Sequence, residues 1–507
     1  MTGRYMRLLP ENRTQFTQDD LEALAHVMTS EQEAPTPEGE PDPEEDPEIT
    51  AAYTYLGQFT DHDLTFDPTS RLREALTDQE LDALADFRTP RFDLDNLYGR
   101  GPDDQPYMYE PDKTHMLLGE RLSGNPFDPD AHDLPRGPNK RALIGDPRND
   151  ENRIVAQLHA IFLRFHNKVA DYLIRANPGK KVSFDDVRNQ VRWHYQWVLV
   201  NDFLPRIIND DTYRRVFADP TYPTPTLCGL RDGLRLMPVE FSVAAFRFGH
   251  SMIRPEYRLN TTIPRRPIFS PRAGRRAPVD TTADLGGFRP IPGDWAIDWQ
   301  FFVQLEPGVE VMALGPRDEP IRIMREPQKA YKIDTSLVAP LGDLPPDVAS
   351  HPKNLARRNL ERGAVFWLPT GQQVARALGE KPIPDDELVI GKATAEDRDK
   401  LQPLKDIASG FAGRAPLWAY ILSEAQVTSW HRAGNGASPD PDSIPIKLGP
   451  VGGTIVAEVF AALLLGDRTS YLKQGAPFTP VADFTHDGTR QGRFGLAELI
   501  KFVLRPE

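Results

Sequence analysis

One histidine lies between two aspartates in the segment "LGQFTDHDLTFD", and a glutamine precedes that histidine by four residues. If the segment is helical, Gln58 and His62 are one turn apart and share a face, while Asp61 and Asp63 flank the histidine. Such a face would present an imidazole and an amide to the group opposite. A metal site, a proton relay and a polar surface helix are all compatible with this pattern taken alone.

Two further segments carry single groups that could do chemistry. Arg148 and Glu151 are three residues apart in "GDPRNDE". A permanently charged arginine beside a cavity could stabilise a developing anion, although a capping loop with surface charge has the same pattern. His250 follows Gly249 in the apolar, aromatic segment "AAFRFGHSMI". A buried histidine is commonly a satisfied core residue and less often an axial metal ligand, so both interpretations stay open.

A fourth segment could support such a ligand. Asn359 and Arg362 are three residues apart in "NLARRNLERGAVFWLPTGQ", which places them on one face of an expected helix. An axial histidine needs a hydrogen-bond partner for its second ring nitrogen, and Asn359 could supply it. Many asparagines have no such role, so this residue indicates a site only together with the others.

The elements that must position these residues are mostly helices. Apolar residues recur every three or four positions over residues 151–177 and 183–208, and Thr17 and Ser183 occupy N-cap positions. Shorter helices are expected at residues 239–253, 354–361, 372–378, 417–425 and 453–465. The segment "KRALI", residues 140–144, is one of few strand signals. The fold class is therefore mainly α, with few short strands and long irregular loops.

Residues 1–507 are expected to form a single large domain, because the chain shows no internal repeat and only one linker-like segment. That segment, residues 31–48, is acidic and rich in proline. Such a composition buries little apolar surface, so we expect a disordered loop there without a catalytic role.

Composition excludes several classes of function. The net charge of −14 and the pI of about 5.4 disfavour binding to nucleic acid or to an anionic membrane. The single cysteine, Cys228, excludes an intramolecular disulfide. No apolar run is long enough for a signal peptide or a membrane span. We therefore expect a cytoplasmic protein, with an unusual, non-classical export route as the alternative.

Taken together and in order, these segments resemble the animal-type haem peroxidase superfamily, which includes the mammalian peroxidases such as myeloperoxidase and lactoperoxidase as well as the cyclooxygenases. The resemblance covers residues 53–472, and the short chain is similar to compact bacterial members. Five segments carry it, namely "GQFTDHDLTF", "GDPRNDE", "FRFGHSMI", "NLARRNLERGAVFWLPTGQ" and "GPVGGTIVAEVFAALLLGDRTSYL". One such match could arise by chance, whereas five in the same order are specific.

The resemblance implies a haem b cofactor and a role for each matched residue. His62 would be the distal base that moves the peroxide proton, and Arg148 the distal arginine that favours the negatively charged peroxide oxygen. Gln58 would lie at a halide and water site. His250 would ligate the haem iron with Asn359 as its hydrogen-bond partner, and Arg247 and Arg362 would also contact the cofactor. Haem and hydrogen peroxide would then give a ferryl species that oxidises small donors.

The resemblance implies different roles for the two aspartates beside His62. Asp61 and Glu151 match the two carboxylates that form ester links to the haem. Asp63 matches a calcium ligand, and the partner loop "TPRFDLDNLYG" would complete the shell with Thr89, the Arg91 carbonyl, Asp93 and Asp95. Asn152 stands where myeloperoxidase has a methionine that adds a third link. We therefore expect iodide, thiocyanate, bromide or phenols, rather than chloride, as donors.

Two other functions compete with a peroxidase. A fatty-acid dioxygenase of the cyclooxygenase type would use a tyrosine three residues before the proximal histidine, where this chain has Arg247. A non-catalytic haem- or calcium-binding protein would have no need for His62, Arg148, His250 and Asn359 together. Hydrogen peroxide and small electron donors are the expected partners. The sequence specifies neither the physiological donor, nor the completeness of the ester links, nor the oligomeric state.

Overall fold

The structure is a computed structural model, and it describes residues 3–9, 16–67, 72, 76–219, 223–227, 236–270, 282–346, 348–434, 440–485 and 494–506. Cys228 lies outside these residues. The fold is mainly α, as the apolar spacing predicts. Its α-helices are α1 (Gln18–Val27), α2 (Ala51–Leu64), α3 (Asp78–Ala83), α4 (Asp95–Tyr98), α5 (Arg153–Ala176), α6 (Phe184–Val198), α7 (Leu204–Ile207), α8 (Asp210–Phe217), α9 (Val239–Val243), α10 (Leu355–Val365), α11 (Gly371–Ala377), α12 (Leu404–Ile407), α13 (Leu417–Ala433), α14 (Pro450–Gly466) and α15 (Leu496–Leu504).

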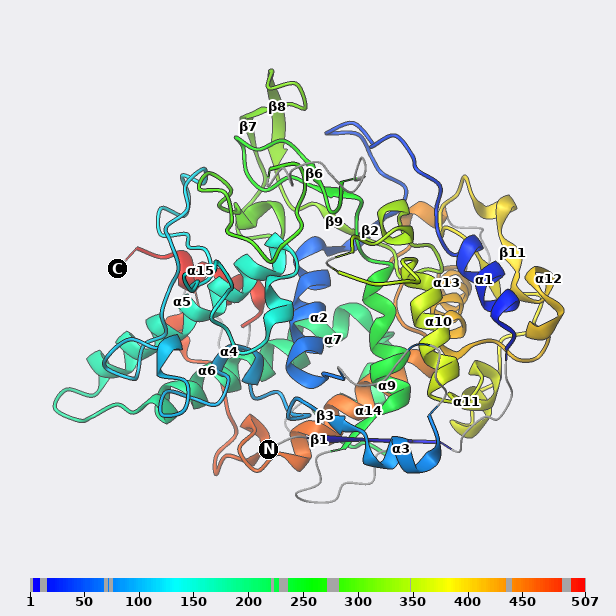
Figure 1. Cartoon of the computed structure of the whole chain (residues 1–507), viewed down its shortest axis with the longest axis horizontal. Helices are drawn as coiled ribbons and strands as arrows, with labels where there is room; N and C mark the ends of the chain where they lie inside the picture. Colours follow the sequence, from blue (N-terminus) through cyan, green and yellow to red (C-terminus); the bar gives the residue numbers. More distant parts are fainter. Residues whose placement is uncertain are drawn as a thin grey trace.

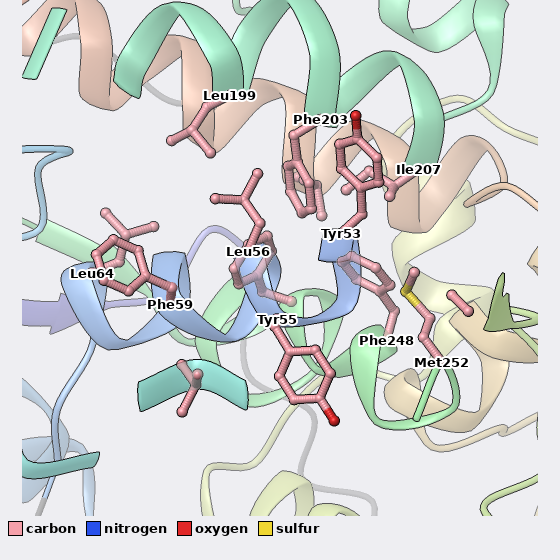
Figure 2. Packing of buried hydrophobic residues seen from close by; sticks show 14 of the residues in the cluster. Tyr53, Tyr55, Leu56, Phe59, Leu64, Leu199, Phe203, Ile207, Phe248 and Met252 are labelled. Carbon is pink, nitrogen blue, oxygen red and sulfur yellow. The ribbon is translucent and has the colours of Figure 1, made fainter. Parts of the chain in front are cut away.

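Helix α2, which carries Gln58, Asp61, His62 and Asp63, lies at the centre of the molecule (Figure 1). Leu56 and Phe59 are fully buried. Figure 2 shows Leu56 pointing toward Phe203, which lies in the π-helical segment Leu199–Phe203 between α6 and α7. Each such side chain stabilises the fold by roughly 1.5–3 kcal/mol when buried. Packing on several sides therefore fixes the position of the helix.

The two long helices behind α2 begin where local capping predicts. Asn152 is the N-cap of α5 and accepts hydrogen bonds from the backbone N–H groups of Ile154 and Val155. Ser183 caps α6 in a capping box with Asp186. The expected helix 183–208 is interrupted by the π-helical turn before it continues as α7. The Asn152 cap fixes the start of α5, and Glu151 and Asn152, directly before this helix, contact Gln58 of α2.

The expected helix over residues 239–253 is broken. Helix α9 ends at Val243, and Ala244 leaves the helical region with φ −130° and ψ −68°. A 3-10 segment, η4 (Ala245–His250), follows. Because a 3-10 helix has fewer residues per turn than an α-helix, the His250 side chain points in a different direction from the one that a regular α-helix would give it. Helices α10 and α13 pack nearby, and α10 carries Asn359 and Arg362.

Strands are few and short among the described residues. They form a three-stranded sheet in the order β3–β1–β4 and four two-stranded sheets. Their bounds are β1 (Gly3–Met6), β2 (Glu45–Thr50), β3 (Ala85–Asp86), β4 (Leu236–Pro238), β5 (Glu256–Tyr257), β6 (Arg266–Pro267), β7 (Val309–Leu314), β8 (Pro320–Arg325), β9 (Lys329–Tyr331), β10 (Val389–Ile390) and β11 (Gln402–Pro403). The β7–β8 hairpin projects from the body of the molecule (Figure 1).

The prediction of a strand at residues 140–144 is wrong. This segment forms a tight turn with a single bridge between Arg136 and Ala142. Gly137 N–H donates to the Arg141 carbonyl, and Lys140 adopts a left-handed conformation with φ 65°. The turn uses the backbone groups that a ladder would need, so no strand follows.

The acidic segment 31–48 also differs from the disordered loop that its composition predicts. Glu38 forms an ion pair with the buried Arg258, and Glu45 forms one with the buried Arg254. Asp46 is completely buried and accepts hydrogen bonds from three backbone N–H groups. Buried arginines require counter-charges. The prediction of disorder failed because composition describes only the segment itself. It does not show that buried arginines more than 200 positions away pair with the carboxylates of the segment.

The buried apolar side chains form one continuous cluster that extends from Tyr5 to Val503. No helix in the described ranges combines the length and apolar character needed to span a bilayer.

Candidate active site

A cavity of about 280 Å³ lies between α2, the start of α5 and η4. Much of its wall is apolar or aromatic, including Phe246, Phe248, Met252 and Ile268. The structure brings six side chains that the sequence singled out to this one cavity, namely Gln58, Asp61, His62, Glu151, Arg247 and His250.

His62 is buried and is held through one ring nitrogen. Its Nδ1–H donates to Asn149 Oδ1 at 2.8 Å, and Asn149 Nδ2 in turn donates to His159 Nδ1 at 3.0 Å. Burial and, to a smaller extent, the nearby Arg148 charge lower the pKa of His62 to about 3. The ring is therefore neutral at ordinary pH, and Nε2 is the ring nitrogen that remains free to act in the cavity.

His250 is held in a similar way on the opposite wall. Asn359 Nδ2 lies 2.8 Å from His250 Nδ1, and Asn359 Oδ1 accepts a hydrogen bond from Arg247 at 2.9 Å. Burial, followed by the Arg247 charge, lowers the pKa of His250 to about 3. The Arg247 contact turns the amide nitrogen of Asn359 toward the ring, and Nε2 is again the free edge.

Two carboxyl groups belong to the cavity wall. Gln58 Nε2 donates to Glu151, and Asn152 Nδ2 donates to Gln58 Oε1 at 3.0 Å. Burial raises the pKa of Glu151 to about 7, and burial also raises the pKa of Asp61. Thr65 Oγ1 donates to Asp61 Oδ1 at 3.1 Å. Both carboxyl groups therefore lie in an environment that disfavours free negative charge.

Two arginines singled out from the sequence do not line this cavity. Arg148 donates to Asp146 at 2.8 Å and to the Thr65 carbonyl at 2.6 Å, at the end of α2. Asp146 is fully buried and needs a counter-charge, which explains why the Arg148 side chain points toward Asp146. Arg362 lies 3.3 Å from Asp67. Arg148 therefore acts on the site through the charge that it places near His62.

The sequence patterns missed Asn149 and His159. Asn149 follows Arg148 directly, and both Asn149 and His159 are completely buried. His159 also contacts the Phe59 ring at a centroid distance of 5.9 Å. An asparagine next to a motif arginine is the only local signal, and its direction toward His62 depends on how η2 (Pro147–Asp150) meets α2.

A second cluster lies below the same helix. The carboxylates of Asp63, Asp93 and Asp95 offer ligand atoms within 4.8 Å of one another. Neither carboxylate oxygen of Asp63 makes a hydrogen bond of ordinary geometry, although it is completely buried. Burial, then the Asp93 and Asp95 charges, raises the pKa of Asp63 well above its usual value. Arg88 lies 3.6 Å from Asp95, and a cation between the three carboxylates would offset their remaining repulsion.

The loop residues around this cluster are arranged in part as the sequence predicts. Thr89 Oγ1 lies 3.0 Å from a carboxylate oxygen of Asp93 and 3.0 Å from one of Asp95. The Arg91 side chain points elsewhere, toward Asp467 at 3.7 Å. Only the backbone of Arg91 is therefore left as a possible ligand.

Comparison with known proteins agrees with this arrangement. Residues 84–274 match the family model described as animal haem peroxidase, a range that includes Arg148 and His250. Peroxidasin from Drosophila melanogaster is 25% identical over 348 residues, which are 67% of this chain and 19% of that protein. The matched segments span 12% to 20% of the lengths of the curated relatives.

Two solved structures share the fold. Peroxidase A from Dictyostelium discoideum has a TM-score of 0.61 and 16% identity, covering 95% of this chain and 92% of that one. A fatty acid alpha-dioxygenase from Oryza sativa has a TM-score of 0.56 and 14% identity, covering 99% and 79%. The family match, the ordered segments and the shared fold agree: part of the chain is similar to animal haem peroxidases, and its fold is one that a peroxidase and a fatty acid alpha-dioxygenase share.

Proposed function

We propose that the chain is a haem peroxidase that reduces hydrogen peroxide and oxidises small electron donors. One observation carries this proposal. Two histidines, the buried His62 and the half-buried His250, line one cavity, each is held at Nδ1 by an asparagine side chain, and each has a pKa lowered to about 3. A neutral imidazole with a fixed second nitrogen suits both a metal ligand and a general base.

The residues of the cavity fit haem b. His250 would hold the haem iron through Nε2, and Asn359 and Arg247 behind the ring would fix its orientation. Asp61 and Glu151 offer carboxyl groups with raised pKa values, which suit ester links to the cofactor better than free negative charge. When bound, the haem supplies the two-electron redox chemistry.

His62 is the proton-transfer group in this proposal. Its Nε2 accepts a proton from hydrogen peroxide, and it returns that proton to the oxygen that leaves as water. The bond from Nδ1–H to Asn149 Oδ1 fixes the tautomer that has a lone pair at Nε2. The Arg148 charge keeps the ring neutral before the proton arrives. Gln58 and Glu151 hold each other in the wall beside it.

We further propose that Asp63, Asp93 and Asp95 bind calcium, with Thr89 and the Arg91 carbonyl as additional oxygen ligands. The closeness of the three carboxylates and the unpaired oxygens of the buried Asp63 support this choice, because calcium prefers hard oxygen ligands. The ion would join α2 to the loop before α4 and thereby hold His62 in place. It takes no part in the reaction itself.

Iodide, thiocyanate, bromide and phenols are the candidate donors. A fatty-acid dioxygenase is disfavoured despite the similar fold, because the position three residues before His250 is Arg247, which is bonded to Asn359 and carries no phenol.

The test uses haem-loaded protein and one equivalent of hydrogen peroxide, followed by stopped-flow absorbance. Wild type should respond promptly, and His62→Ala should respond about 10²–10⁴-fold more slowly while it still binds haem. His132→Ala removes a histidine that does not line the cavity and should respond like wild type. A prompt response in His62→Ala, or a wild-type protein that binds no haem, would overturn the proposal.

A further inference from the structure

A second and larger cavity adjoins the one that contains His62 and His250. It measures about 920 Å³ and is formed by parts of residues 30–44, 254–270 and 331–353, together with Lys392. We call this cavity the vestibule. Phe269 and Leu344 line both cavities, so the two share a wall. The vestibule therefore lies directly beside the inner cavity, with these two side chains between them.

The acidic segment that follows α1 forms one side of the vestibule. It runs as a long connection from α1 to β2 (Figure 1). The ion pair between Glu38 and Arg258 attaches this segment to the body of the molecule. Arg265 strengthens the attachment, because its Nε lies 3.4 Å from Glu38. These ion pairs hold the segment in place as one wall of the vestibule.

Carboxylates outnumber cations in the lining. Each lining cation already has a carboxylate partner: Lys392 pairs with Glu33 and Glu44, Lys353 with Asp343, Arg265 with Glu256, and Arg254 with Glu45. Glu31 and Asp42 add further negative charge, and Asp42 accepts a hydrogen bond from Tyr331. With a net charge of −14 on the whole chain, the vestibule repels anions and attracts cations.

The remaining lining suits flat apolar groups. Phe269 and Leu344 face both cavities, and Val338 adds apolar surface to the vestibule. Six prolines supply rigid apolar surface, namely Pro35, Pro255, Pro267, Pro340, Pro345 and Pro346. Binding sites for small organic molecules combine such apolar walls with a few polar groups. An aromatic ring fits this surface, and a hydrated halide gains nothing from it.

We propose that the vestibule selects aromatic donors that are neutral or positively charged, phenols and phenols bearing an amine, over small anions. This choice of substrate class presupposes the peroxidase function proposed above. Two phenols each lose one electron and the hydroxyl proton and leave as phenoxyl radicals. One hydrogen peroxide gains those two electrons and two protons, its O–O bond breaks, and two waters form.

The test compares two phenols that differ in the charge of the side chain. Tyramine carries an ammonium group, and 3-(4-hydroxyphenyl)propionate carries a carboxylate. The haem-loaded protein should show a kcat/KM for tyramine about tenfold higher at low ionic strength. The ratio should shrink toward one in roughly 0.5 M salt, where charges more than a few ångströms apart are screened. Iodide should be a poorer donor than tyramine.

Two matched charge reversals locate the effect. Glu31→Lys changes an exposed vestibule residue, and Glu120→Lys changes an exposed residue that lines neither cavity. Glu31→Lys should lower the tyramine preference several-fold, whereas Glu120→Lys should leave it unchanged. Both should react with hydrogen peroxide at the wild-type rate, because peroxide is uncharged. Equal effects of the two reversals would mean that net charge, and not the vestibule, governs the choice.

A bulky variant tests the route itself. Ala339 lines the vestibule but not the inner cavity. Ala339→Trp should raise the KM for tyramine and leave the reaction with peroxide intact. Unchanged tyramine kinetics in Ala339→Trp, or a wild-type protein that uses both phenols equally or prefers iodide, overturns the vestibule inference alone. A wild-type protein that does not react with peroxide overturns the peroxidase proposal instead.

Discussion

At the scale of single residues, the site depends on two asparagines that orient two histidines. Asn149 fixes His62, and Asn359 fixes His250. Both rings have a lowered pKa and are neutral at ordinary pH, so their usefulness depends on which nitrogen faces the cavity. The asparagines therefore decide which ring nitrogen of each histidine is available for chemistry, although they take no part in that chemistry themselves.

The two asparagines should fail differently when they are replaced. Asn149→Ala frees the His62 ring and should slow the reaction with hydrogen peroxide by up to about 100-fold, without changing haem affinity. Asn359→Ala removes the support of His250 and should weaken haem binding by about 10- to 100-fold. Stopped-flow kinetics and haem titration separate the two effects. Equal losses in both measurements for both variants would mean that the asparagines serve only general packing.

At the scale of elements, α2 is held from both sides. Its upper face packs on the π-helical segment and α7 (Figure 2), and its Asp63 meets the loop that carries Asp93 and Asp95. The second of these contacts joins like charges, which repel each other unless a cation lies between them. The calcium ion proposed for this cluster would therefore hold α2 in place one residue away from His62.

Chelation should expose this dependence. A calcium chelator should lower the melting temperature of the wild-type protein, because an ion at about 100 times its Kd contributes about 2.7 kcal/mol. Asp93→Asn should lose the calcium response and should be more stable than wild type in chelator, since one repelling carboxylate is gone. Calorimetry with and without calcium measures both effects. A wild-type protein that is indifferent to chelation would contradict the calcium site.

A buried glutamate joins two other helices. Glu424 on α13 accepts hydrogen bonds from the backbone N–H groups of Val451 and Gly452 at the start of α14, at 2.9 and 3.2 Å. Burial raises its pKa to about 8, and the two N–H groups offset this only in part. A raised folded pKa means that its contribution to stability is fully present below about pH 4.5 and is lost as pH rises through about 8.

Glu424→Gln should therefore flatten the pH dependence of stability. Between pH 5 and pH 8.5 the wild-type protein should lose on the order of 3 kcal/mol more unfolding free energy than the variant. The glutamine keeps an oxygen acceptor for α14 but does not ionise. Denaturant unfolding at the two pH values measures the difference. Parallel pH profiles for the two proteins would show that Glu424 is already ionised in the fold.

At the scale of the whole molecule, the cofactor cavity is part of the core. Its walls come from segments as distant as residues 53 and 355, and its apolar members belong to the continuous hydrophobic cluster. A ligand bound only by the folded chain raises stability by mass action. Haem should therefore act as part of the core.

Haem at about 1,000 times its Kd should stabilise the protein by about 4 kcal/mol, seen as a higher melting temperature in calorimetry. His250→Ala should lose most of this increase, and His62→Ala should keep it, because only His250 is proposed to ligate the iron. An equal increase in both variants would mean that haem binds at some other place.

The sequence by itself determined the residues that are able to do chemistry and much of the helical framework. His62, Arg148, His250 and Asn359 are recognisable because their types and order recur in a known family. Helices α5 and α6 are recognisable because caps and apolar spacing are local signals. Such signals need no knowledge of the rest of the chain.

The tertiary structure alone decided where several of these groups point. Arg148 turns to Asp146, and η4 breaks a helix so that His250 faces the cavity. The acidic segment after α1 becomes a wall because Glu38 pairs with Arg258, 220 positions away. The reason is physical: a side chain turns toward the buried charge or open edge that needs it, and distant segments supply those partners only after the chain has packed.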